Sequence, residues 1–191
     1  MRLLLAILWL LVPLGFAAYH FGPGQEKVKF DQTEAFLADA RAAVSSEEWP
    51  AAIDSYQKAL AQLPKDEKET ALRIELEIAK AKMQDGGLPE AREELASLVD
   101  RLNDDPSLPA DLRQDALSTL ANSRYYMTYL MKLEGLPASE WEPEIEAARQ
   151  EYKLLAQTGG DREKHLADLE SAIRLACAEP TELYGLPIPN Q

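Results

Sequence analysis

The chain has 191 residues, of which 46% are hydrophobic and 28% are charged, so its composition is that of a globular protein rather than a disordered one. With 20 Lys and Arg against 33 Asp and Glu, its formal net charge is −13. This balance excludes nucleic acid as the expected partner, because phosphate binding requires clustered Lys and Arg. Ala, Leu, Glu and Lys are abundant and Val and Ile are scarce, which predicts an all-α fold.

The amino-terminal segment, residues 3–21, contains no charged residue and is rich in leucine. As a helix it would be about 28 Å long, close to the thickness of the hydrocarbon layer of a membrane. The sequence therefore predicts a transmembrane signal-anchor over residues 1–21, with residues 3–21 in the lipid bilayer. Arg2 favours a cytoplasmic amino terminus, which places the rest of the chain in the periplasm, on the extracytoplasmic side of an inner or plasma membrane.

A cleaved signal peptide is the alternative for this segment. Gly15 and Ala17 are small residues at the spacing that precedes a cleavage site, and the cut would fall at Ala18. Tyr19 and Phe21 favour the anchor, because aromatic side chains are typical of the interface between lipid and water. Both interpretations stay open from the sequence.

The rest of the chain is predicted to form helical hairpins in residues 32–178, after a linker at residues 22–31. Apolar residues recur at steps of three and four, which is the period of an amphipathic helix. The predicted helices cover residues 32–44 and 49–63, then 72–83 and 89–102, then 109–133 and 143–156, with a final capping helix at 162–178. Residues 179–191 form a tail that contains several prolines.

Small and aromatic residues mark the first hairpin at a recognisable spacing, namely Ala40, Ala52, Tyr56, Ala59 and Pro64. This pattern resembles the tetratricopeptide repeat (TPR), in which small residues stand where paired helices cross closely and an aromatic residue fills the gap to the next hairpin. Ala91 matches in the second hairpin, although it follows Ala52 at more than the family's period of about 34 residues. Ala148 and Tyr152 repeat the spacing of Ala52 and Tyr56 in the third. The resemblance implies an α-solenoid of about three hairpins and a cap.

No motif for catalysis, for a cofactor or for a metal ion is found in the sequence. It lacks the serine-nucleophile motif, the zinc-binding histidine pair on one helix and the phosphate-binding glycine loop. Of the two histidines only His165 falls in the predicted helical domain, where a surface or cap position is expected. Cys177 is the only cysteine and is expected to be a small core residue. The chain is therefore predicted not to be an enzyme.

The candidate partner-binding residues lie on the first helix of the third hairpin, where Asn122, Tyr125, Tyr126 and Tyr129 recur at helical steps. Such helices line the concave groove of TPR domains, and tyrosine is common at protein-binding hot spots. The alternative is that these residues pack in the core, and this choice stays open. Tyr184 is a further candidate in the apolar tail, which could dock on the chain's own groove or on a partner.

The predicted function is that of a membrane-tethered, non-catalytic scaffold that binds a membrane-associated protein partner. A small anchored TPR protein of this kind is similar to accessory proteins encoded beside MoxR-type ATPases and von Willebrand A domain membrane proteins. The alternative is a soluble periplasmic or secreted protein that uses a tyrosine-lined groove to bind a small ligand.

Overall fold

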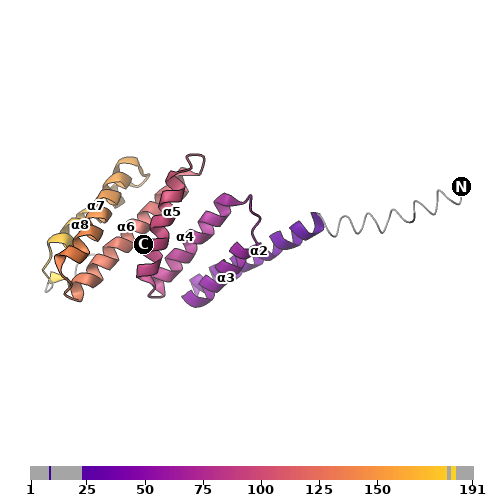
Figure 1. The fold of residues 1–191 in the computed structure, drawn as a ribbon, viewed down its shortest axis with the longest axis horizontal. Coiled ribbons are helices and arrows are strands. Elements are labelled where there is room, and N and C mark those ends of the chain that lie inside the picture. Colours follow the sequence, from indigo (N-terminus) through magenta and orange to yellow (C-terminus); the bar gives the residue numbers. More distant parts are fainter. Residues whose placement is uncertain (1–8, 10–22, 180–181, 184–191) are drawn as a thin grey trace. The chain divides into compact units, whose positions relative to one another are not determined.

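The regular secondary structure in the described residues consists only of helices, which confirms the prediction of an all-α fold. A computed structural model describes residue 9, residues 23–179 and residues 182–183, with only the backbone of residues 23–29. Its helices are α2 (Pro23–Ser45), α3 (Trp49–Gln62), α4 (Lys68–Gln84), α5 (Leu88–Asn103), α6 (Ala110–Leu133), α7 (Ala138–Thr158) and α8 (Arg162–Cys177), and Figure 1 labels each of them.

The chain divides into two compact units, Met1–Ile74 and Glu75–Gln191, with the boundary inside α4. In the first unit α2 packs on α3 as a hairpin. Ala40, Ala52 and Ala59 have no exposed surface and Tyr56 is also buried, so the small residues lie where the two helices approach each other. Pro64 follows the end of α3, where its missing N–H interrupts no helical hydrogen bond.

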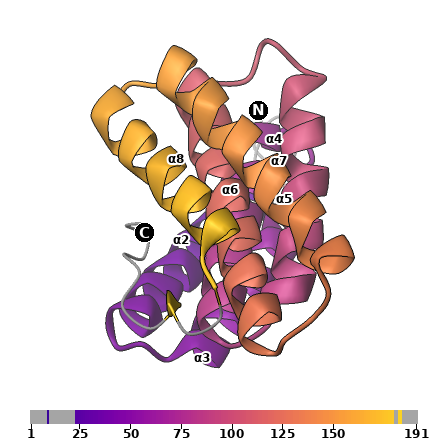
Figure 2. The ribbon, with the colours of Figure 1, turned by 90° about the vertical axis from the view of Figure 1, so that its left-hand side faces the viewer.

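In the second unit consecutive helices lie side by side in chain order, as the contacts of α5 with α6, α6 with α7 and α7 with α8 require (Figure 1). The Lys82 ammonium on α4 lies 2.7 Å and 2.6 Å from the carboxylates of Glu90 and Glu94, and so joins α4 to α5. Figure 2 shows α8 beside α7 at the carboxyl-terminal end of the unit. Ala91 and Ala148 are completely buried.

The first helix of each hairpin ends in the same turn. The backbone N–H groups of Glu48, Gly87 and Leu136 each donate a 2.9 Å hydrogen bond to the carbonyl five residues earlier. The residue before each donor has a positive φ, at Glu47, Gly86 and Gly135. This is the Schellman arrangement, which satisfies the last carbonyls of a helix and reverses the chain. Glycine suits this conformation at Gly86 and Gly135, but glutamate at a left-handed position could not be predicted, because that conformation favours glycine.

Three helices begin several residues earlier than predicted, among them α4, which begins at Lys68 rather than at residue 72. The helix α2 begins at Pro23 rather than at residue 32, so it includes most of the predicted linker. The helix α7 begins at Ala138 rather than at Pro143, which lies inside it. Pro143 is close enough to the start of α7 that the bond it removes would have gone to Ser139, an exposed residue whose carbonyl can bind water.

The predicted membrane segment, residues 3–21, lies outside the described residues except for Trp9. In the helices that are described, none combines the length and hydropathy needed to cross a bilayer. The carboxyl-terminal tail is described only as far as Leu183, whose side chain is completely buried. Tyr184 lies outside the described residues.

Candidate partner-binding site

One core cluster of the second unit lies between α6, α7 and α8, and two tyrosines are its largest fully buried side chains. Tyr125 on α6 and Tyr152 on α7 share this core cluster with Leu155, Leu175 and Leu183. Burial raises the pKa of Tyr125 to about 12 and also raises the pKa of Tyr152. Both hydroxyls therefore stay protonated at physiological pH, and both rings build the core.

Asn122 is also an interior residue. Its Oδ1 accepts a 2.7 Å hydrogen bond from the Tyr152 hydroxyl, and its side chain is buried beneath the surface of α6. Of the four candidates predicted on this helix, Asn122 and Tyr125 thus belong to the interior. A partner at the surface of α6 would meet other side chains.

The other two candidates, Tyr126 and Tyr129, are half-buried and pack against the edge of the same core cluster. The Tyr126 ring meets the Tyr125 ring edge to face, with 5.9 Å between the ring centroids. Leu130 and Leu133 continue on the same side of α6 and are 45% and 39% exposed. These four residues follow the spacing i, i+3, i+4 and i+7, so they share one helical face. We call this surface the α6 strip.

Lys132 holds the end of α8 next to the α6 strip. Its ammonium donates hydrogen bonds of 2.8 Å and 3.1 Å to the carbonyls of Leu175 and Ala176, in the last turn of α8. It also lies 4.1 Å from the centroid of the Trp141 ring on α7. Burial lowers the pKa of Lys132, but a cation at the carboxyl end of a helix is favourable. One side chain therefore joins α6, α7 and α8 directly beside Leu133.

A network of ion pairs lies on the opposite face of α6. The Arg124 guanidinium lies 2.8 Å from Glu144 and 3.1 Å from Glu151, both on α7, and Glu144 lies 3.5 Å from Arg92 on α5. Burial raises the pKa of Glu151 to about 7, although Arg124 opposes this shift. Arg124 and Tyr126 are separated by about 200° around the helix, so the network is remote from the α6 strip. It fixes the packing of three helices.

This network could not be predicted from the sequence, although a signal for one side of it exists. Glu144 and Glu151 are seven residues apart and therefore share one face of α7. Glutamate near the start of a helix also complements the helix dipole, so the sequence provides no reason to expect a basic partner there. Only the positions of α5 and α6 show that Arg92 and Arg124 are opposite these carboxylates.

The structure differs from the predictions at two single residues. His165 was expected at a surface or cap position; it lies on α8, the predicted capping helix, but it is buried, and its Nδ1 lies 4.0 Å from Oδ2 of the buried Asp168. Burial lowers the pKa of His165 and raises the pKa of Asp168, so it disfavours the charged form of each. Cys177 was expected in the core but is exposed, because it lies on the face of α8 that turns away from Ala172 and Leu175.

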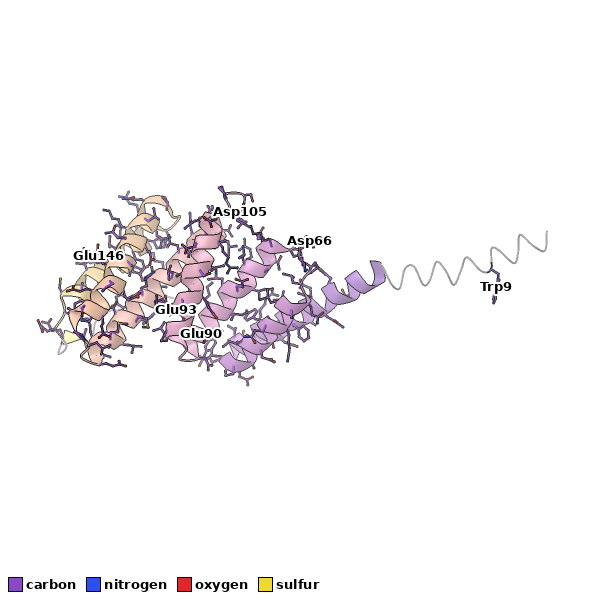
Figure 3. All side chains as sticks on the ribbon, viewed as in Figure 1. Trp9, Asp66, Glu90, Glu93, Asp105 and Glu146 are labelled. Atoms are coloured by element: carbon purple, nitrogen blue, oxygen red, sulfur yellow. The ribbon has the colours of Figure 1, made fainter. Side chains whose placement is uncertain are left out.

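Three of the acidic residues labelled in Figure 3 lie in the second unit beside basic side chains. Glu90 and Glu93 extend from the first turns of α5 and Glu146 extends from α7, and all three are exposed. Their carboxylates lie within 3.6 Å of Lys82, Arg92 and Arg149 respectively. The negative charge at these three positions is therefore balanced by a nearby cation.

Comparison of the chain with models of known protein families, with curated proteins and with solved structures gives no match. The likeness to TPR proteins thus depends on the residues of the chain itself, and those residues are buried small and aromatic side chains in helical hairpins.

Proposed function

We propose that the chain is a non-catalytic, TPR-like scaffold that is tethered to a membrane by residues 3–21 and binds a protein partner on the extracytoplasmic side. The α6 strip is the proposed contact surface. The observation that carries the proposal is the exposure of Leu130 and Leu133 beside the half-buried Tyr126 and Tyr129.

Tyrosine is enriched at protein-binding hot spots, and exposed leucines beside it add apolar area that a partner can bury. Burial of leucine against a partner contributes about 25 cal/mol of favourable free energy per Å² of apolar area. Tyrosine adds ring area and a polar hydroxyl. The buried core beneath the strip supports this role, because a rigid surface loses little entropy on binding. In each of the three hairpins the first helix ends in the same turn, which supports the TPR-like architecture.

The partner is proposed to be a membrane-associated protein, since both proteins would then be held at the surface of the same membrane. Tethering raises the effective concentration of one protein near the other and so strengthens a contact of modest area. The resemblance to the accessory proteins of MoxR-type ATPases and von Willebrand A domain proteins supports a role in the assembly of a membrane complex.

The experiment is a crosslinked pull-down from detergent-solubilised native membranes, with the full chain as bait. The test variant is Leu130→Asp with Leu133→Asp, and the matched control is Leu154→Asp with Leu166→Asp, which changes leucines on α7 and α8 that are 48% and 44% exposed. We expect one stoichiometric membrane protein with the wild-type chain and the control, and a loss of at least about tenfold with the test variant. Equal capture by both variants would exclude the α6 strip.

Mass spectrometry of the bait's amino terminus separates the two functions that the sequence leaves open. A terminus that retains residues 3–21 supports the tethered scaffold. A terminus near Ala18 without any protein partner would instead support the soluble binding protein.

A further inference from the structure

We propose that the α6 strip binds extended, proline-containing apolar peptides, and that the chain's own carboxyl-terminal segment, residues 184–191, occupies it as an intramolecular ligand. This inference rests on the proposed function, because it assigns an occupant to the same surface. It adds the class of peptide that the surface takes and a means of regulating its access.

The described chain ends at a residue that is buried in the core. Leu183 has no exposed surface and belongs to the same core cluster as Tyr125. Tyr126 and Tyr129 pack against that cluster from α6. The turn that precedes Leu183 is held by a 2.8 Å hydrogen bond from the Glu182 N–H to the Glu179 carbonyl. Residues 184–191 therefore follow a side chain that is buried in the cluster against which two residues of the strip pack.

The extended length of residues 184–191 exceeds the length of the α6 strip. The α6 strip extends from Tyr126 to Leu133, which is about 10 Å along the helix axis. An extended segment with the polyproline II rise covers about 3 Å per residue, so residues 184–191 reach about 25 Å. The segment is thus long enough to cover the whole strip from its starting point at Leu183.

Residues 184–191 are uncharged and contain two prolines. Residues 184–191 contain no charged residue, in a chain of which 28% is charged, and include Leu186, Pro187, Ile188 and Pro189. The two prolines exclude a helix and favour the extended conformation, which loses little entropy on binding. Surfaces that bind such peptides present aromatic side chains, and Tyr126 and Tyr129 lie beside the exposed Leu130 and Leu133.

A second chain is disfavoured as the occupant, because two copies that each carry a net charge of −13 repel each other. A tail on the same chain reaches an effective concentration in the millimolar range, so even a weak contact is occupied. A protein partner would then have to displace residues 184–191, and removal of these residues should strengthen partner capture.

The test uses the full chain in detergent micelles with isotopically labelled leucine methyl groups. A spin label is attached at Gln191→Cys in a Cys177→Ser background, because Cys177 is exposed and would also react. We expect selective broadening of the Leu130 and Leu133 methyl signals, with Leu154 and Leu166 unchanged. A variant with Leu186→Asp and Ile188→Asp should remove the broadening without changing the fold.

Three outcomes would overturn the inference. The first is broadening at Leu154 and Leu166 equal to that at Leu130 and Leu133, and the second is no broadening at either pair. The third is broadening that arises only when a spin-labelled copy is mixed with a separate isotope-labelled copy, which would identify a second chain as the occupant.

A synthetic peptide of residues 184–191, added to a chain that ends at Leu183, provides an independent measurement. We expect it to shift the Leu130 and Leu133 methyl signals and to leave those of Leu154 and Leu166 in place. If the tail experiments fail while the α6 strip variant still loses its partner in the pull-down, the proposed function stands and only this inference is wrong. If the pull-down fails and the tail experiments succeed, the strip is a self-binding surface only.

Discussion

The Tyr152 hydroxyl on α7 donates a 2.7 Å hydrogen bond to Oδ1 of Asn122 on α6, inside the core of the second unit. Tyr152 has no exposed surface, so neither group can exchange this bond for one with water. The bond joins residues that are 30 positions apart in the chain. It gives the α6–α7 hairpin a specific register in addition to its apolar packing.

We expect Tyr152→Phe to lower the free energy of unfolding by about 1–3 kcal/mol, because Oδ1 of Asn122 stays buried without this donor. Urea denaturation of the variant and of Tyr129→Phe, a change at a half-buried ring, provides the comparison. Tyr129→Phe should change stability by less than about 0.5 kcal/mol. A double-mutant cycle with Asn122→Ala should show coupling, and strict additivity would contradict the role of this bond.

Lys132 is expected to stabilise the end of α8. In Lys132→Met the carbonyls of Leu175 and Ala176 lose a charged donor, which should cost about 1.5–3 kcal/mol. Hydrogen exchange should accelerate in the last turn of α8 and not in α5. Lys153→Met, at an exposed lysine on α7, is the matched control. Unchanged exchange in α8 would show that these hydrogen bonds do not hold the helix end.

Glu151 is expected to make stability depend on pH near neutrality. Burial raises its pKa from 4.5 to about 7, so the folded chain holds this proton more tightly than the unfolded chain. Its contribution to stability is therefore complete below about pH 4.5 and is lost as the pH rises through about 7. The unfolding free energy of the wild type relative to Glu151→Gln should fall by on the order of 2 kcal/mol between about pH 5 and about pH 8.

Glu170→Gln is the control for this titration, since Glu170 is exposed and pairs with Arg174 in the same helix. Its stability relative to the wild type should stay constant over the same range of pH. The same slope in both variants would assign the pH dependence to the overall charge and not to Glu151.

The two glycines between α7 and α8 should respond differently to alanine. A Cβ at Gly159 would lie 2.6 Å from the Leu155 carbonyl oxygen and 3.1 Å from Nε2 of His165, whereas a Cβ at Gly160 would meet nothing within 4 Å. Gly159→Ala should therefore lower the free energy of unfolding by about 1–3 kcal/mol. Gly160→Ala should be neutral or slightly stabilising, by up to about 1 kcal/mol. Thermal unfolding of the pair tests this, and equal melting temperatures would contradict the close approach.

Much of the helical architecture could be predicted from local signals. Pro89 and Pro137 lie at helix starts, and Gly86 and Gly135 have the positive φ that ends a helix in a Schellman turn. These preferences depend on the residue and its immediate neighbours, so a single sequence contains them. The turn at Glu47 has the same conformation without glycine, and there the prediction lacked a local signal.

The sequence by itself determined the all-α fold, the two hairpin turns at Gly86 and Gly135, and the set of candidate tyrosines on α6. Only the tertiary structure decided which of these tyrosines are interior and which are at the surface. The reason is that α6 contacts α5, α7 and α8, so apolar residues recur around most of the helix and its period does not identify one buried face. Tyr125 and Tyr126 are neighbours in the chain. However, α7 and α8 cover Tyr125 completely, whereas Tyr126 stays half-buried as part of the α6 strip.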